Sequence, residues 1–249
     1  MERLTEPWAP DNCSLCGSNK NLTGEHKIKA SLLRRLFGQE AMVIGRFDGA
    51  DRPRHAQGPK SRAFHFKNNA SLCKDCNGAI TQPADRAFER FHLLALDHFE
   101  SGDDPDKVFQ HAEFSVNSSE YLDLFRYFAK ILACHIAEDC GPRLTPLTQF
   151  ARGLSNHNIV LLHIKYDETY VHVSTEFGIN SYAAHDGLQA LLNKSGKRVR
   201  GFQSSLTIGP ICYTFWIKFG CLVGLHMRLA HPAFWRLCLA APRQMPDGS

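Results

Sequence analysis

Apolar residues recur at helical spacing in four stretches of the chain, and this periodicity predicts helices over residues 31–37, 84–99, 120–138 and 227–239. The helix over 84–99 is favoured further by Pro83, because proline suits the first helical turn. The stretch 120–138 is strongly amphipathic, and Gly141-Pro142 marks its end. Helices therefore supply much of the expected core.

Alternating apolar and polar residues predict β-strands over residues 41–47, 62–67, 158–166 and 170–175, and two further strands within 198–219. The stretches 158–166 and 170–175 are expected to form a hairpin around Asp167-Glu168. The most apolar stretch, 208–229, is interrupted by charged residues, and Tyr213, Phe215 and Ile217 alternate within it. That alternation favours a buried strand over a membrane span.

The segment 101–106 (Ser-Gly-Asp-Asp-Pro-Asp) is the best candidate for a linker, because glycine, proline and clustered aspartates resist regular structure. It divides the 249 residues into portions 1–100 and 107–249, each large enough for a core of its own. Both portions mix helical and strand patterns. The predicted fold class is therefore α+β.

Positive charge is concentrated near the N-terminus, although the whole chain carries a formal net charge of only +4. Residues 20–74 contain twelve Lys and Arg against four Asp and Glu, a net of +8, whereas residues 97–123 have a net of −7. A local basic block attracts phosphate groups, but charge alone favours an ordinary solvated loop equally well. Residues 1–10 show no secretory signal, and we expect a cytoplasmic protein.

Two C-x2-C pairs, Cys13/Cys16 and Cys73/Cys76, form the strongest motif in the sequence. Together they supply the four sulfur ligands that tetrahedral Zn²⁺ prefers in a structural site, and Gly17 is typical of a tight turn with positive φ. Four protein ligands leave no open position, so this zinc is expected to stabilise the fold without taking part in chemistry. Unrelated reduced cysteines or a redox pair are the weaker alternatives.

Polar residues lie between and directly after these pairs. Glu25-His26 follows the first pair, Asn68-Asn69 precedes Leu72, and Asn77 directly follows Cys76. As a set, these motifs resemble the HNH nuclease family with zinc-binding cysteine pairs, over residues 13–90 of the chain. The resemblance implies an N-terminal ββα-metal (treble-clef) domain, in which a two-stranded ribbon and a helix surround one divalent ion, followed by a second α+β domain.

By this resemblance, His26 is the general base that takes a proton from the attacking water, a task suited to an imidazole with a pKa near neutrality. Glu25 and Asn77 correspond to the oxygen ligands of a catalytic Mg²⁺ or Mn²⁺ ion. Asn68 corresponds to the asparagine that braces the ribbon or orients the base, with Asn69 as the fallback assignment. The chain departs from the family at Glu25, where aspartate is common.

Cations near this motif are candidate contacts to a phosphate backbone, since Lys and Arg beside a nuclease site usually position the backbone without reading bases. Lys60, Arg62 and Arg86 are the residues selected, although an ordinary solvated side chain is an equally good interpretation of each one. Asp85 is expected to favour the first turn of a helix electrostatically more than to act as a ligand.

The sequence therefore predicts an endonuclease that hydrolyses phosphodiester bonds, with double-stranded DNA as the expected partner. Residues 107–249 would supply substrate choice, homodimerisation, contact with a partner subunit or regulation, and a role in bacterial phage defence or restriction is implied by the family resemblance alone. The alternative is a non-catalytic zinc knuckle that binds nucleic acid or a protein partner. Metal-dependent cleavage that requires His26 separates the two functions.

Overall fold

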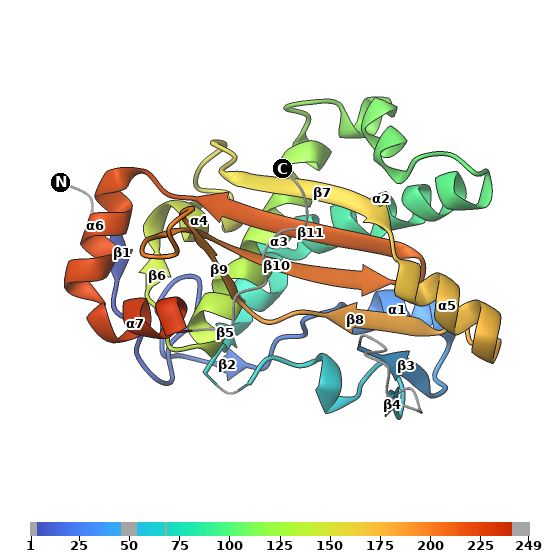
Figure 1. Cartoon of the computed structure of the whole chain (residues 1–249), viewed down its shortest axis with the longest axis horizontal. Helices are drawn as coiled ribbons and strands as arrows, with labels where there is room; N and C mark the ends of the chain where they lie inside the picture. The colour runs from blue at the N-terminus through green and yellow to red at the C-terminus, as the bar shows by residue number, and fades with distance from the viewer. Residues whose placement is uncertain (1–3, 46–53, 68, 241–249) are drawn as a thin grey trace.

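The computed structural model describes residues 4–45, 54–67 and 69–240, and it has the mixed α+β architecture that the sequence predicts. A β-sheet and a layer of helices pack against each other (Figure 1). The α-helices of this described part are α1 (Ala30–Phe37), α2 (Gln82–Glu100), α3 (Ser119–Glu138), α4 (Thr145–Ala151), α5 (Glu168–Phe177), α6 (Cys221–Ala230) and α7 (Pro232–Ala240). Shorter helical turns are η1 (Arg62–Phe64), η2 (Cys76–Ile80), η3 (Pro105–Gln110) and η4 (Ala112–Phe114).

The main sheet has seven strands within the described residues. Six of them lie side by side in the order β4 (Arg54–Ala56), β3 (Met42–Ile44), β8 (Tyr182–His185), β10 (Val199–Ile208), β11 (Ile211–Lys218) and β7 (Val160–Tyr166). The seventh, β9 (Gln189–Leu192), pairs with the first half of β10. All pairings are antiparallel except that of β3 with β8.

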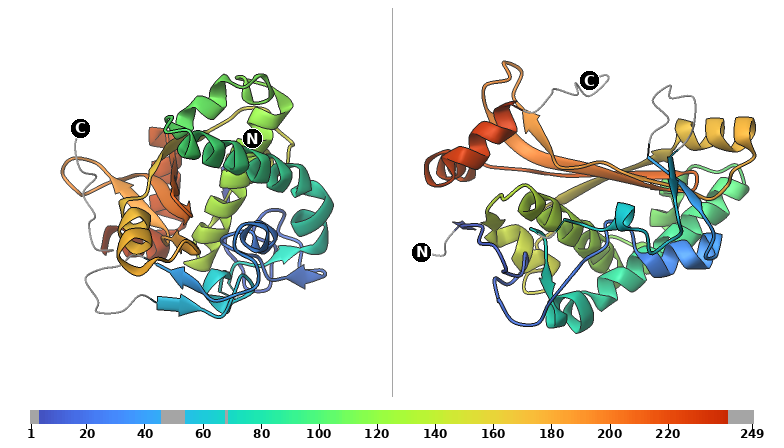
Figure 2. Two further views of the ribbon diagram at one scale, coloured as in Figure 1. Left: turned by 90° about the vertical axis from the view of Figure 1, so that its right-hand side faces the viewer. Right: turned by 90° about the horizontal axis from the view of Figure 1, so that it is seen from below.

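Helices α2 and α3 cover one face of the main sheet, as the edge-on view in Figure 2 shows. Strand β10 alternates accordingly. Phe202 and Leu206 are buried, whereas Gln203 and Ser205 are only half-buried. An antiparallel sheet with one packed face and one solvated face produces this pattern, which is why the strand signal in the sequence is clear.

One continuous hydrophobic core contains residues from both sides of segment 101–106. Phe88 of α2 stacks on Tyr127 of α3 with ring centroids 4.0 Å apart, and it meets Tyr213 of β11 edge-on at 5.4 Å. Strands β3 and β4 also extend the sheet formed by the C-terminal strands. The division into 1–100 and 107–249 stays a prediction, and the two portions meet through this shared core.

Short pairings outside the main sheet bring distant segments together. Strand β1 (Thr5–Glu6) pairs with β6 (Arg143–Leu144), and β2 (Leu22–Thr23) pairs with β5 (Leu72–Cys73). An isolated antiparallel bridge also joins His26 to His65. The ββα-metal domain implied by the family resemblance stays a prediction.

The strand predicted over residues 62–67 is wrong. Residues 62–64 form the 3-10 turn η1, and the Ser61 hydroxyl accepts a hydrogen bond from the Ala63 N–H at 3.4 Å. Phe64 and Phe66 alternate with polar residues because both rings are buried. These residues form no strand, and the single bridge at His65 is their only β-pairing in the described structure. The serine cap offers the backbone a local alternative to strand pairing.

The strand predicted over residues 170–175, and with it the hairpin around Asp167-Glu168, is also wrong. These residues lie in helix α5, whose first turn is capped by the Asp167 carboxylate through the N–H groups of Thr169 (2.8 Å) and Tyr170 (3.2 Å). Gly178, with φ 64°, ends the helix. Strand β7, the predicted partner of residues 170–175, pairs with β11.

The helix predicted over residues 227–239 is divided into α6 and α7. His231 separates them, and Pro232 begins α7 because its missing N–H prevents a continuous helix. The helices expected near 31–37, 84–99 and 120–138 are confirmed as α1, α2 and α3. The strand expected over 41–47 is described over Met42–Ile44, and residues 46–47 lie outside the described residues.

Candidate functional site

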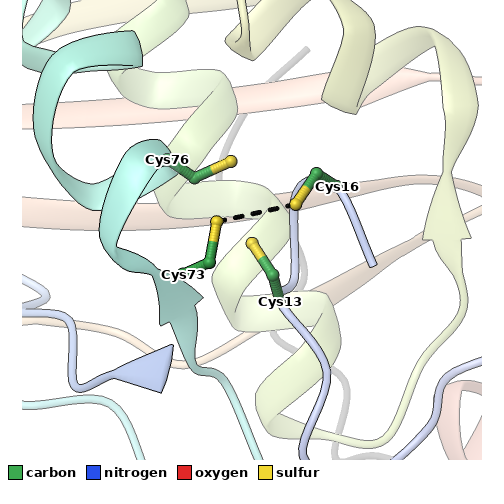
Figure 3. A group of neighbouring side chains, drawn as sticks. All are labelled: Cys13, Cys16, Cys73 and Cys76. Atoms are coloured by element: carbon green, nitrogen blue, oxygen red, sulfur yellow. Dashed lines mark hydrogen bonds between the residues drawn. The ribbon is translucent and has the colours of Figure 1, made fainter. Parts of the chain in front are cut away.

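Four cysteine side chains from two segments of the chain meet at one point (Figure 3). The Sγ atoms of Cys13, Cys16, Cys73 and Cys76 all lie within 4.8 Å of one another, and those of Cys16 and Cys73 are 3.6 Å apart. These cysteines form no disulfide. A tetrahedral zinc with Zn–S bonds of about 2.3 Å would separate its sulfurs by about 3.8 Å. This four-cysteine cluster could therefore hold a structural metal such as zinc with little movement.

Backbone contacts hold the two cysteine loops against each other. The β2–β5 pairing places Cys73 at the end of a strand, and the Ser14 N–H donates to the Ser71 carbonyl at 2.8 Å. The first loop turns tightly, since the Gly17 N–H donates to the Cys13 carbonyl at 2.9 Å. Gly17 has φ 76°, in the left-handed region that favours glycine, as the sequence predicts.

A hydrogen bond couples the thiols of Cys13 and Cys76. A hydrogen bond from Cys76 lowers the pKa of the Cys13 thiol to about 4, while the same bond and burial raise the pKa of Cys76. Neighbouring thiolates repel one another, and a bound cation would offset this repulsion. The chemistry of this donor set therefore fits a divalent metal that binds thiolates.

A second cluster of polar residues lines a pocket of about 240 Å³ at the start of α1. Glu25, His26 and Asn77 all line this pocket, although Asn77 is distant from the other two along the chain. The other lining residues are Lys29, Ala30, Ser31, Arg34, Asp85, Tyr127 and Lys130. The structure thus brings together three of the site residues predicted from motifs.

A buried lysine is paired with both carboxylates of this pocket. Lys130 Nζ lies 2.9 Å from Glu25 Oε1 and 2.6 Å from Asp85 Oδ1, and the lysine side chain is 2% exposed. Burial alone would lower the pKa of Lys130, but the two carboxylates outweigh burial and hold the pKa above its ordinary value. Burial raises the pKa of Glu25, and Lys130 opposes this shift only in part. The ammonium therefore stays charged and holds both carboxylates in place.

His26 lies on an extended segment that pairs briefly with residues 64–66. The Lys27 N–H donates to the Phe64 carbonyl at 2.7 Å, and the Phe66 N–H donates to the Glu25 carbonyl at 3.0 Å. These two bonds flank His26 and fix its backbone on both sides. The side chain is consequently held at the pocket by an isolated bridge with two backbone hydrogen bonds.

The surroundings of the His26 ring keep it neutral. Burial, aided by the nearby charges of His65, Arg34 and Lys130, lowers the pKa of His26 to about 4. The ring centroids of His26 and His65 are 3.8 Å apart. At neutral pH the His26 imidazole is therefore uncharged and able to accept a proton.

Asn77 is oriented by two hydrogen bonds. Its Nδ2 donates to Thr23 Oγ1 at 2.9 Å and to the Gly24 carbonyl at 3.1 Å. A backbone carbonyl can only accept, so the amide nitrogen of Asn77 must face it and the amide oxygen must face the other way. Oδ1 is therefore the atom that Asn77 can offer to a cation or a donor.

The cations selected from the sequence as phosphate contacts lie elsewhere. Lys60, Arg62 and Arg86 are exposed, and none of them lines the pocket of Glu25 and His26. Their role stays a prediction that would require contacts away from this pocket. The cations that do line it are Lys29, Arg34 and Lys130.

Of the two asparagines predicted to brace the ribbon or orient the base, the structure describes only Asn69. Asn68 lies outside the described residues. Asn69 donates from Nδ2 to the Glu138 carbonyl and to Cys140 Sγ, at 3.3 Å each, so it fastens its loop to the end of α3. Asn69 does not line the pocket.

Sequence reasoning missed the contribution of α3 to the site. Lys130 and Tyr127 come from this helix, and both are almost fully buried. One signal was present, because Lys130 is a single charge within the apolar stretch 127–137 of an amphipathic helix. A buried lysine requires a partner, but the sequence does not say which carboxylate provides it.

Comparisons with known proteins add no family assignment: no family model, curated protein or solved structure matches this chain. The α+β fold and the four-cysteine cluster therefore rest on the geometry described above. Across residues 4–45, 54–67 and 69–240, no helix combines the length and the apolar character needed to cross a bilayer.

Proposed function

We propose that this chain is a metal-dependent nuclease of the HNH type that hydrolyses phosphodiester bonds in DNA. The observation that carries the proposal is the meeting of Glu25, His26 and Asn77 in one pocket. These residues were selected from their motifs, and the local structure of their separate segments does not require them to meet. Asn77 also directly follows Cys76, so the four-cysteine cluster would hold one wall of the site in place.

The pocket supplies the oxygen donors that a hard divalent cation prefers. Glu25 and Asn77 Oδ1 would hold Mg²⁺ or Mn²⁺, which when bound supplies positive charge to phosphate oxygens. The orientation of Asn77 by Thr23 and Gly24 supports this assignment, because it leaves the amide oxygen available. Asp85 adds a second carboxylate to the same pocket.

His26 would accept the proton of the attacking water. Its lowered pKa, about 4, makes it a weak base in the free protein. A phosphate anion bound in the pocket would favour the protonated imidazole and raise this pKa toward the range useful for catalysis. Proton transfer would therefore depend on bound substrate, which restricts the chemistry to the occupied site.

Cleavage of supercoiled plasmid DNA with Mg²⁺ or Mn²⁺ tests the proposal. The His26→Ala variant should cleave at least about a hundredfold more slowly, the usual effect of removing a general base. His157→Ala is the matched control, because His157 is exposed and does not line the pocket. Equal cleavage by wild type and His26→Ala would overturn the proposed role of this histidine.

A non-catalytic binding module is a second candidate, and one observation favours it. Glu25 is already paired with the buried ammonium of Lys130. A carboxylate paired in this way attracts a divalent cation less strongly than a free carboxylate does. This alternative predicts salt-sensitive binding of nucleic acid, no metal-dependent cleavage, and unchanged binding in Asn77→Ala.

A further inference from the structure

One cation of the pocket has no ionic partner among the described residues. Lys130 is paired with both pocket carboxylates, and Lys29 is paired with Glu89 at 3.3 Å. Arg34 also lines the pocket and is half-buried, but no carboxylate in the described part of the chain lies within ion-pair distance of it. A guanidinium held at a pocket wall without a partner is available to an anionic ligand.

The first turn of α1 opens on the same pocket. Ala30 and Ser31 line it, and the N-cap residue Lys29 makes no side-chain capping bond. The first amides of a helix have no acceptor within the helix and carry the positive end of its dipole. A ligand with several acceptor oxygens would therefore find amide donors and a guanidinium together.

Two hydroxyl groups of pocket residues also lack an acceptor for their proton within the described structure. Ser31 Oγ is buried and makes no hydrogen bond with residues 4–45, 54–67 or 69–240. The buried Tyr127 hydroxyl meets the Lys29 N–H, but its own proton has no acceptor among those residues. Tyr127 is 1% exposed, so water cannot easily satisfy its hydroxyl in the folded chain. Buried donors of this kind are uncommon. Tyr127 belongs to α3, so its hydroxyl is an observation separate from the terminus of α1.

We propose that this pocket binds a phosphate group, with Arg34 as the guanidinium contact and the first turn of α1 as the amide contact. Arg can bond two phosphate oxygens at once, and a helix N-terminus favours an anion. The volume of about 240 Å³ far exceeds the ~10–15 Å³ that one bound water needs, so a phosphate group fits. Lys130 offsets part of the repulsion from the two carboxylates.

The identification of this phosphate as a nucleic-acid phosphodiester rests on the proposed function, whereas the preference for an anion does not. Binding of a short fluorescein-labelled double-stranded DNA is therefore measured without added Mg²⁺ or Mn²⁺, with the DNA checked for integrity. Arg34→Gln should raise Kd about tenfold, as expected for loss of a charged hydrogen bond. It should also reduce the slope of log K against log salt by roughly one.

Arg35→Gln is the matched control. Arg35 is the next residue of the same helix, but it is exposed, paired with Glu89 at 3.2 Å and absent from the pocket lining. Its substitution should leave Kd and the salt slope unchanged. Inorganic phosphate added as a competitor separates the two sources of the anion. If phosphate displaces the DNA from the wild type but not from Arg34→Gln, the site is open to free phosphate. If DNA binding depends on Arg34 and phosphate does not displace the DNA, the site binds a phosphodiester.

Equal Kd values and salt slopes for wild type and Arg34→Gln would overturn this inference, and so would absence of DNA and phosphate binding by the wild type. The nuclease proposal would survive the first result if His26→Ala still loses cleavage. Arg34-dependent binding without any metal-dependent cleavage would support the inference and overturn the nuclease. If Arg34→Gln fails to fold, Arg34→Lys, which keeps the charge and loses the planar fork, should give an intermediate Kd.

Discussion

The ammonium group of Lys130 lies 2.9 Å from Glu25 Oε1 in the interior of the molecule. Lys130 comes from α3, whereas Glu25 follows β2 near the start of the chain, so this pair joins segments more than a hundred residues apart. The attraction is strong because little water screens it. The same pair sets the charge that a cation or a phosphate meets in the pocket.

Replacing Lys130 by methionine should destabilise the protein by about 3–5 kcal/mol, because the buried Glu25 and the half-buried Asp85 would lose their counter-charge. Urea denaturation measures this loss. Lys107→Met is the control, since Lys107 pairs with Asp103 on the surface and its removal should change stability little. Adding Glu25→Gln to Lys130→Met should restore part of the stability, because it removes the unpaired charge. If it restores none, the loss of stability in Lys130→Met does not come from this ion pair.

Zinc removal should unfold or loosen the region of the four-cysteine cluster. Cys16→Ser should lose the single zinc ion expected per chain and should lower the Tm, because structural zinc contributes an apparent binding free energy on the order of 10 kcal/mol at pH 7. Metal analysis and thermal denaturation measure both effects. Cys221→Ser, at an exposed cysteine outside the cluster, should keep its zinc and its Tm. Full zinc content in Cys16→Ser would argue against a four-sulfur site.

Acidification should destabilise the fold partly through His92. Burial lowers the pKa of His92 to about 3, from 6.5 for the free side chain, and its Nδ1 lies 2.8 Å from the Tyr213 hydroxyl. Below pH 6.5 the unfolded chain binds a proton that the folded chain refuses until about pH 3, so stability is lost as the pH falls through this window. The contribution is about 1.4 kcal/mol per pH unit.

His92→Gln removes this titration and keeps an amide that can bond the Tyr213 hydroxyl. Urea denaturation at several pH values should therefore give a shallower loss of stability for the variant than for the wild type between neutral pH and about pH 4. Parallel curves for the two proteins would show that His92 is not buried in its neutral form.

Gly201 should not tolerate a side chain. A Cβ atom at this position would lie 2.0 Å from the Ile217 carbonyl oxygen of the neighbouring strand. Gly201→Ala should therefore force β10 and β11 apart and cost about 3 kcal/mol, which urea denaturation can measure. Gly187→Ala is the control, because no atom lies within 4 Å of its Cβ position. A Gly201→Ala variant as stable as wild type would contradict the pairing of Gly201 with Lys218 in the β10–β11 register.

Long periodic segments could be located from the sequence, because their signals repeat over several turns or residues. Helix α3 and strands β10 and β11 are of this kind. The two wrong strands share a physical cause. Each prediction was based on a short alternation of apolar residues. Beside each alternation lies a capping residue, Ser61 or Asp167, whose side chain accepts a hydrogen bond from the backbone of a helical turn. A few apolar positions cannot outweigh such a local bond.

The four-cysteine cluster was more predictable than the pocket. Two cysteines separated by two residues already face one point, so each half of the four-cysteine cluster is a local property, and the β2–β5 pairing joins the halves. The pocket is a property of packing. Lys130 and Tyr127 reach it because α3 lies against α2, where Tyr127 stacks on Phe88.

Residue types and short spacings were enough to single out the four cysteines and to select Glu25, His26 and Asn77. Each motif is local: two C-x2-C pairs, one Glu-His dipeptide and one asparagine next to a cysteine. The partner of Glu25, the availability of Arg34 and the neutrality of His26 were settled by folding. Each of these depends on which charges the common core brings within a few ångströms and on how much water it excludes. Distances between remote segments arise from the packing of many side chains at once, and no local pattern contains them.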